Sequence, residues 1–201
     1  MKRIDCLKAL APYVTDEDLV VISLGGTGLE WNAVHPGDNN LFIIAMGCNT
    51  PLALGMALAL KHRRIILLET DGSLLLTMGA IATLGNAAPP NLRVFVFDNE
   101  GYERVKHDIS ATKGKTDLAE VARACGIGNA CTARTTDEFA QAAEETMSGD
   151  GLSFVVAKVE PGIADVPGRP GDGLEDKYRF VRYVEKLEGK QILAAYRAKF
   201  G

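Results

Sequence analysis

Five short runs of mostly apolar residues, interleaved with stretches of helical spacing, constrain the fold most strongly. The runs are rich in Val, Ile, Leu and Phe, and they cover residues 19–24, 40–46, 63–70, 91–99 and 152–160. Because they are continuously apolar rather than alternating, they are typical of strands buried on both faces. Helical patterns occur at residues 3–13, 51–62, 73–86, 116–126 and 137–149. The sequence therefore predicts an α/β fold, a doubly wound parallel sheet with helices on both faces.

The length of the chain suits one domain of ordinary size. It has 201 residues, of which 47% are hydrophobic, and a chain of this length can bury a substantial core. The composition changes at Pro161, because residues 161–180 hold 3 prolines and 4 glycines. We interpret residues 1–160 as the folded domain and residues 161–201 as a loop with a C-terminal helical tail.

The charge pattern argues against several kinds of partner. The formal net charge is -4, and acidic and basic residues are interspersed, so no basic stripe is present for nucleic acid or an anionic membrane surface. The N-terminal segment is charged, and no apolar stretch reaches the length of a membrane-spanning helix. The four cysteines lack metal-ligand spacing. We expect a cytoplasmic protein that binds neither nucleic acid nor membrane.

Polar residues interrupt the apolar pattern at "LLETDGSLLL" and place Asp71 directly after a predicted strand. A carboxylate that enters an apolar interior must be paired, hydrogen-bonded or bound to a metal. Asn99 follows the next strand along the chain. Because the carboxyl ends of parallel strands share one edge of the sheet, where ligands bind, we expect the two side chains to lie close together.

Asp71, Asn99 and the carbonyl group of Gly101 offer the oxygen ligands that Mg²⁺ prefers. Gly72 and Ser73 open the following helix, where backbone N–H groups and a hydroxyl could bind a phosphate. The pattern therefore predicts a Mg²⁺ and diphosphate site. The alternative is that both segments are ordinary turns with helix caps.

Taken together, the two segments resemble a known cofactor motif. The segment "ETDGSLLLTMGAIATLGNAAPPNLRVFVFDNEGY" is similar to the thiamine diphosphate motif, Gly-Asp-Gly followed after some distance by Asn-Asn. The resemblance extends to "AMGCNTPLALGMALAL" and "TDLAEVARACGI". The chain resembles the diphosphate-binding (C-terminal TPP-binding) domain of thiamine diphosphate-dependent enzymes. It is most similar to the separate β subunits of the sulfopyruvate and phosphonopyruvate decarboxylases.

The resemblance implies thiamine diphosphate and Mg²⁺ as cofactors, held by residues 1–160. By position in the motif, Asp71, Asn99 and the Gly101 carbonyl would bind Mg²⁺. Asn99 and Gly101 would thereby also contact the cofactor. Gly72 and Ser73 would bind its diphosphate.

The same resemblance implies roles for five further residues. Met46 falls where the family places the bulky residue that props the cofactor into its bent shape, and Gly47 and Tyr102 would also contact the cofactor. Met46, Glu103 and His107 are the catalytic candidates. Glu103 and His107 could contact substrate, and His107 could move protons near neutral pH. The alternatives are a core methionine and a solvated loop.

A partner chain also follows from the resemblance. Enzymes of this kind need a glutamate that is hydrogen-bonded to the pyrimidine ring of the cofactor and comes from a second domain. A chain of 201 residues that already forms the diphosphate domain has no room for it. The resemblance thus implies a hetero-oligomer with a pyrimidine-binding α subunit. The implied reaction is decarboxylation of a small 2-oxoacid, similar to sulfopyruvate or phosphonopyruvate.

Departures from the motif leave the substrate and other functions open. Thr70 replaces the first Gly of the motif, Asp98 replaces the first Asn, and no Gly-Gly-Gln segment follows Tyr102. One alternative is an acetolactate synthase-like carboligase subunit. Another is a non-catalytic, degenerate domain that stabilises a partner. A nicotinamide site at "ISLGGTGLEW" is disfavoured because Trp31 stands in place of the third glycine.

Overall fold

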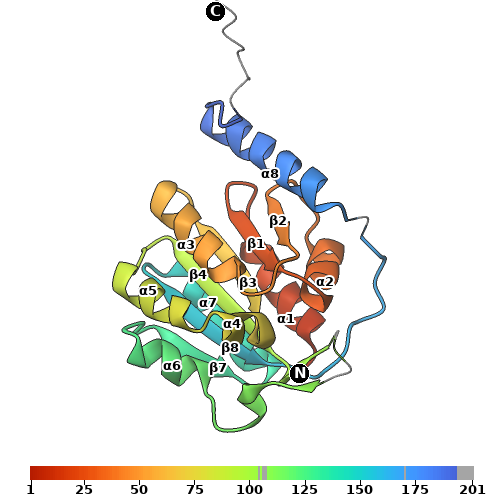
Figure 1. Ribbon diagram of the computed structural model, residues 1–201, viewed down its shortest axis with the longest axis vertical. Helices are drawn as coiled ribbons and strands as arrows, with labels where there is room; N and C mark the ends of the chain where they lie inside the picture. The colour runs from red at the N-terminus through yellow and green to blue at the C-terminus, as the bar shows by residue number, and fades with distance from the viewer. Residues whose placement is uncertain (104, 106–107, 170, 194–201) are drawn as a thin grey trace, which may run out of the picture.

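The structure is a computed structural model that describes residues 1–103, 105, 108–169 and 171–193 (Figure 1). Its centre is a 6-stranded parallel sheet with the order β2-β1-β3-β4-β8-β7. The strands are β1 (Leu19–Ser23), β2 (Asn40–Ile43), β3 (Ile65–Thr70), β4 (Leu92–Asp98), β7 (Ala130–Ala133) and β8 (Ser153–Lys158). Because the direction of chain progression changes between β1 and β3, their carboxyl ends flank the crevice where such sheets bind ligands.

Helices cover both faces of the sheet (Figure 1). One face carries α1 (Arg3–Leu10), α2 (Gly26–Val34) and α7 (Thr136–Ser148), and the other carries α3 (Asn49–Ala59), α5 (Gly79–Ala87) and α6 (Leu118–Ala124). The short helix α4 (Asp71–Leu76) starts at the carboxyl edge, and α8 (Gly173–Glu188) packs beside β2. Among the described residues, no helix combines the length and hydropathy needed to cross a bilayer.

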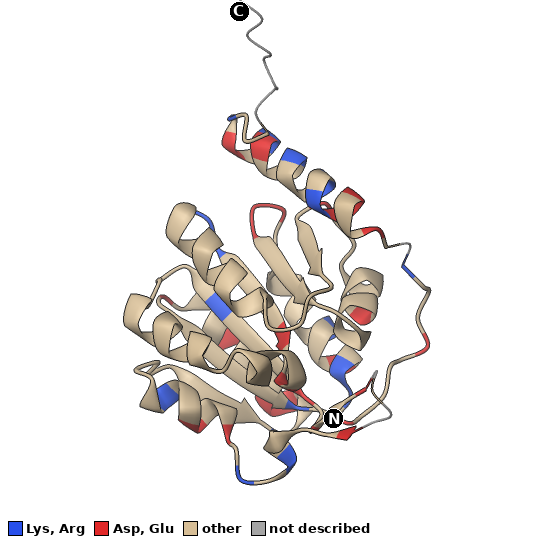
Figure 2. Ribbon diagram, viewed as in Figure 1, with Lys and Arg blue, Asp and Glu red and all other residues tan. Residues whose placement is uncertain are grey.

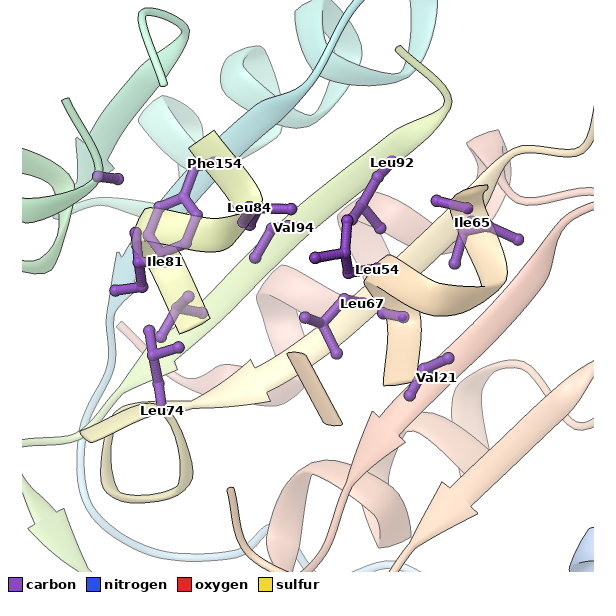
Figure 3. Close-up of a cluster of buried hydrophobic side chains, with 14 of the residues drawn as sticks. Val21, Leu54, Ile65, Leu67, Leu74, Ile81, Leu84, Leu92, Val94 and Phe154 are labelled. Carbon is purple, nitrogen blue, oxygen red and sulfur yellow. The ribbon is translucent and has the colours of Figure 1, made fainter. Parts of the chain in front are cut away.

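Successive residues of the central strands point into two separate cores. Val21 of β1 and Leu67 of β3 pack with Leu54 of α3 (Figure 3). Their neighbours Val20 and Ile66 pack in the other core, beneath α1, α2 and α7. Since both faces of each central strand are buried, these strands are apolar at nearly every position, as the sequence predicts.

Side-chain caps fix the starts of two helices. The carboxylate of Asp117 accepts hydrogen bonds from the backbone N–H groups of Ala119 at 2.9 Å and Glu120 at 3.1 Å, at the start of α6. Thr135 and Glu138 form a reciprocal capping box at the start of α7. These caps satisfy N–H groups that have no partner within the helix.

The doubly wound sheet predicted from the sequence is confirmed, with local differences. The predicted helix at residues 73–86 is two helices, α4 and α5, separated at Thr77 and Met78. Helix α2, which begins in the glycine-rich segment after β1, and the short strand β7 are absent from the predicted elements. A hairpin of β5 (Gly101–Tyr102) and β6 (Asp108–Ile109) follows β4. The tail helix α8 begins at Gly173, within the proline- and glycine-rich residues 161–180.

Candidate cofactor and metal site

A pocket lies at the carboxyl edge of the sheet, where the segments after four strands converge. The segments after β1, β2, β3 and β4 contribute Gly25, Met46, Asp71 and Asn99, respectively. The lining also includes Gly72, Gly101, Tyr102 and Glu103. The structure thus brings most of the sequence-predicted site residues into one pocket. Gly47 and Ser73 are buried beside it, whereas His107 lies outside the described residues.

Asp71 is fully buried at the start of α4. Its Oδ2 atom accepts hydrogen bonds from Ser110 Oγ at 2.6 Å and Thr112 Oγ1 at 3.3 Å. Its Oδ1 atom has no hydrogen-bond partner in the part of the chain that the structure describes. Burial raises the pKa of the Asp71 carboxyl to about 6, opposed by the Ser110 hydrogen bond and assisted by the charge of Asp98. A buried carboxylate oxygen without a donor suits a cation.

A second buried carboxylate, Asp98, lies at the end of β4. Its Oδ1 atom accepts a hydrogen bond from Thr112 Oγ1 at 2.6 Å, and its Oδ2 atom is 2.7 Å from Lys158 Nζ. Asp98 and Lys158 are register partners on β4 and β8. Lys158 therefore compensates the charge of Asp98, while the Thr112 hydroxyl contacts both carboxylates and holds Asp71 and Asp98 together.

The loop after β4 turns tightly at Glu100, which has a positive φ of 60°. The N–H group of Gly101 donates to Asn99 Oδ1 at 3.1 Å, which fixes the orientation of the amide. That oxygen has a second lone pair, so it remains able to bind a cation. A Cβ atom at Gly101 would lie 3.1 Å from the carbonyl oxygen of Asp108, so the hairpin leaves little room for a side chain.

The first turn of α4 directs the Ser73 side chain into the protein. Ser73 is fully buried, and its Oγ atom accepts hydrogen bonds from Gly47 N at 3.0 Å and from Asn49 Nδ2 at 3.1 Å. The first N–H groups of a helix have no partner within it. The backbone N–H groups of Gly72 and Ser73, rather than the hydroxyl, are therefore the donors suited to a phosphate.

Glu103 belongs to a cluster that fastens the β5 loop. Its Oε1 atom lies 3.2 Å from Arg3 Nη1 and accepts a hydrogen bond from Gly162 N at 3.1 Å. Arg3 is nearly fully buried, and its Nε atom lies 3.0 Å from Glu30 Oε2. Arg3 lines the pocket together with Glu103. The cluster thus ties α1, α2, the β5 loop and the segment after β8 together beside the site.

Sequence reasoning missed the residues that support the two carboxylates. Ser110 and Thr112 are common residue types in an irregular segment, so no local pattern marks them. Lys158 did carry a signal, because it ends an otherwise apolar strand in "SFVVAK". A lysine at the carboxyl end of an otherwise apolar strand indicates a negative charge on the neighbouring strand.

Gly72 leaves no room for a side chain, and this predicts a measurable effect. A Cβ atom there would lie 2.7 Å from Cδ1 and Cε1 of the Tyr102 ring. We expect Gly72→Ala to displace Tyr102 and to lower the free energy of unfolding by roughly 1–3 kcal/mol, as overpacking does. Urea unfolding measures this. The control is Gly55→Ala in α3, where a Cβ meets nothing within 4 Å, and stability should stay equal or rise. Equal stability of the Gly72→Ala and wild-type proteins would contradict this packing.

The comparison with protein families defines the class of this chain. Residues 32–157 match the family described as "Thiamine pyrophosphate enzyme, C-terminal TPP binding domain". The chain belongs to this family, and the resemblance stated from the sequence is confirmed. The Oδ1 atom of Asp71, which accepts no hydrogen bond from the described residues, fits a metal ion that binds a diphosphate.

Comparison with individual proteins identifies more specific similarities. The chain is 29% identical over 187 residues to the sulfopyruvate decarboxylase subunit beta of Methanococcus maripaludis, covering 92% of this chain and 99% of that one. It is 31% identical over 171 residues to the phosphonopyruvate decarboxylase of Streptomyces viridochromogenes, covering 84% of this chain but 42% of that protein. The benzoylformate decarboxylase of Polynucleobacter necessarius shares the fold, with a TM-score of 0.71, 20% identity, and coverage of 82% of this chain and 34% of that one.

Proposed function

We propose that the chain binds thiamine diphosphate and Mg²⁺ and acts as the β subunit of a heteromeric 2-oxoacid decarboxylase. The observation that carries this proposal is the buried Asp71, whose Oδ1 atom has no donor in the described structure and whose pocket also contains Asn99 and Gly101. The family membership and the near-complete coverage of a sulfopyruvate decarboxylase β subunit support it.

In this proposal each residue of the pocket has a defined task. Asp71, Asn99 and the Gly101 carbonyl hold Mg²⁺ by oxygen ligands. The N–H groups of Gly72 and Ser73 bind the diphosphate at the start of α4. When bound, thiamine diphosphate supplies the nucleophilic carbon and accepts the electron pair released as carbon dioxide leaves.

Met46 and the hairpin would act on the reacting end of the cofactor. Met46 is partly exposed and lines the pocket, so its flexible thioether side chain can support the cofactor rings. Tyr102 packs over Gly72 and limits the access of water to the diphosphate end. Glu103 and His107 remain candidates for substrate contact, with Glu103 also fastened to Arg3.

Exposed apolar side chains support the proposed α-subunit partner. They surround the carboxyl edge on several elements and include Ile44, Leu76, Met78, Val105 and Ile109. Helices α3 and α5 on the same side carry no charged residues, and Figure 2 shows their ribbons free of charge colouring. Apolar surface of this kind is typical of an interface. We propose that a pyrimidine-binding subunit covers it and supplies the activating glutamate.

Calorimetry tests the proposal directly. Thiamine diphosphate is titrated into the purified chain and into its complex with a co-expressed pyrimidine-binding subunit, each with and without Mg²⁺. We expect binding that requires metal and is strongest in the complex. The loaded complex is then given sulfopyruvate, phosphonopyruvate and pyruvate, and carbon dioxide release is measured. Absence of metal-dependent binding in both preparations would contradict the proposed cofactor. Binding without carbon dioxide release would favour a non-catalytic role.

A further inference from the structure

A buried polar cluster lies behind the pocket and is centred on Asn49, at the start of α3. The Asn49 Nδ2 atom is 3.0 Å from Ser23 Oγ, 3.0 Å from Glu69 Oε1 and 3.1 Å from Ser73 Oγ. All four residues are 0–1% exposed. Ser23 ends β1 and Glu69 lies near the end of β3. The cluster therefore joins the rigid ends of two central strands to α4.

This cluster continues into the turn that carries Met46. The Ser73 hydroxyl, held by Asn49, also accepts a hydrogen bond from Gly47 N at 3.0 Å. The carbonyl of Gly47 accepts one from Thr77 Oγ1 at 2.9 Å. Gly47 has a φ of 77°, and a Cβ atom there would lie 2.9 Å from Thr77 Cγ2. The backbone of the turn is thus fixed against α4 on both sides.

The hydrogen-bonding capacity of Ser73 explains why Asn49 matters to this turn. A hydroxyl oxygen has two lone pairs and one proton, and it rotates freely unless its partners fix it. Gly47 N and Asn49 Nδ2 both donate to this oxygen, and Asn49 shares its two N–H groups among Ser73, Ser23 and Glu69. Without Asn49, Ser73 could rotate and release Gly47.

We propose that Asn49 is a positioning residue that sets how Met46 meets the cofactor, by holding Ser73 and through it the Met46–Gly47 turn against α4. This role rests on the proposed function, because contact between Met46 and thiamine diphosphate is part of it. Met46 is 36% exposed at the pocket, and the backbone turn that carries it sets where its side chain enters. Asn49 acts through Ser73 and Gly47 and does not itself bind the cofactor.

The test compares Asn49→Ala with Thr50→Val. Thr50 is the neighbouring buried residue, and its Oγ1 atom donates to the other oxygen of the same carboxylate, Glu69 Oε2, at 3.2 Å. Both variants thus remove a donor to Glu69, but only Asn49→Ala removes the link to Ser73. The readout is the methyl NMR signal of Met46 in methionine-labelled protein. Met46→Leu identifies this signal among the 5 methionines.

In the wild-type and Thr50→Val proteins, Mg²⁺ with thiamine diphosphate should shift the Met46 methyl signal. In Asn49→Ala most of this shift should be lost while the dissociation constant changes by less than about threefold, a difference that a purely structural defect would not produce. A full shift in Asn49→Ala, or an equal loss in Thr50→Val, would overturn the positioning role.

A milder variant keeps the test informative if Asn49→Ala does not fold. Thr77→Val keeps the side-chain shape but removes the second anchor of Gly47, on a partly exposed residue. Like Asn49→Ala, it should reduce the change in the Met46 methyl signal that the cofactor causes. A change as large as in the wild-type protein would overturn the claim that α4 fixes this turn. If the wild-type chain binds no cofactor either alone or in complex with the pyrimidine-binding subunit, the proposed function fails. If the wild-type protein binds the cofactor and Asn49→Ala shows the same Met46 shift as the wild type, only the positioning role is refuted.

Discussion

Replacing Asp71 by alanine should abolish Mg²⁺-dependent binding of thiamine diphosphate and leave the domain folded. The reason for the first effect is that Asp71 contributes a buried carboxylate oxygen that no described donor occupies. We expect the affinity for the cofactor at saturating Mg²⁺ to fall by at least about 100-fold, because even residues that only support a metal ligand contribute 10–100-fold. Calorimetric titration of the complex measures this change.

The effect of Asp71→Ala on stability should be small because two contributions oppose each other. The variant loses the hydrogen bonds from Ser110 and Thr112. It also removes a carboxylate whose raised pKa reports unfavourable burial and repulsion by Asp98. The free energy of unfolding should change by no more than roughly 1–2 kcal/mol.

Asp117→Ala is the matched control for the loss of a carboxylate. Asp117 caps α6 away from the pocket lining, so this variant should lose about 1 kcal/mol of stability and keep its cofactor affinity. The two variants thus have opposite expected phenotypes. Unchanged affinity in Asp71→Ala would remove the proposed metal site and make Asp71 a turn residue only.

The sheet and the edge that carries the site were predictable because they depend on strong, local patterns. Strands buried on both faces must be apolar at successive positions, and residues such as Val20 and Val21 pack in different cores. Once the strands are parallel, the residues that follow them meet at one edge. The placement of Asp71 and Asn99 in one pocket follows from these two facts alone.

Other features could not be predicted because they depend on contacts between distant segments. The break between α4 and α5 coincides with Thr77, whose hydroxyl bonds to the Gly47 carbonyl from another loop. Gly26, the first residue of α2, has no room for a side chain because Arg3 of α1 packs directly against it. The sequence around Gly26 and the sequence around Thr77 give no sign of these contacts with distant segments.

The surroundings of Asp98, at the site itself, also depend on a contact that the local sequence does not predict. Asp98 departs from the motif of the family, which has an asparagine there, and taken alone this departure argues for a degenerate site. The structure places Lys158 opposite Asp98 on β8, with 2.7 Å between Lys158 Nζ and Asp98 Oδ2. The added negative charge is therefore compensated within the fold, and Asn99, the proposed metal ligand next to it, is retained.

This compensation predicts a large loss of stability when Lys158 is replaced. Lys158→Met should leave Asp98, 1% exposed, as a buried carboxylate without its cation and close to Asp71. Removing one partner of a buried ion pair costs about 3–5 kcal/mol, because the remaining charge is uncompensated. Urea unfolding of the variant measures this loss. Lys177→Met on α8 is the control, since Lys177 is exposed and should change stability by no more than about 0.5 kcal/mol.

A double variant separates compensation of charge from simple loss of packing. Asp98→Asn alone should cost less than Lys158→Met, because Lys158 keeps Glu100 Oε1 at 3.4 Å and is partly exposed. In the protein with both changes, the amide needs no cation, so most of the loss caused by Lys158→Met should be recovered. If the two losses simply add, Lys158 stabilises the strand end by packing alone. If they do not add, Asp98 and Lys158 stabilise the protein as an ion pair. This pair then preserves the shape of the motif around Asn99 although Asp98 replaces the asparagine of the family.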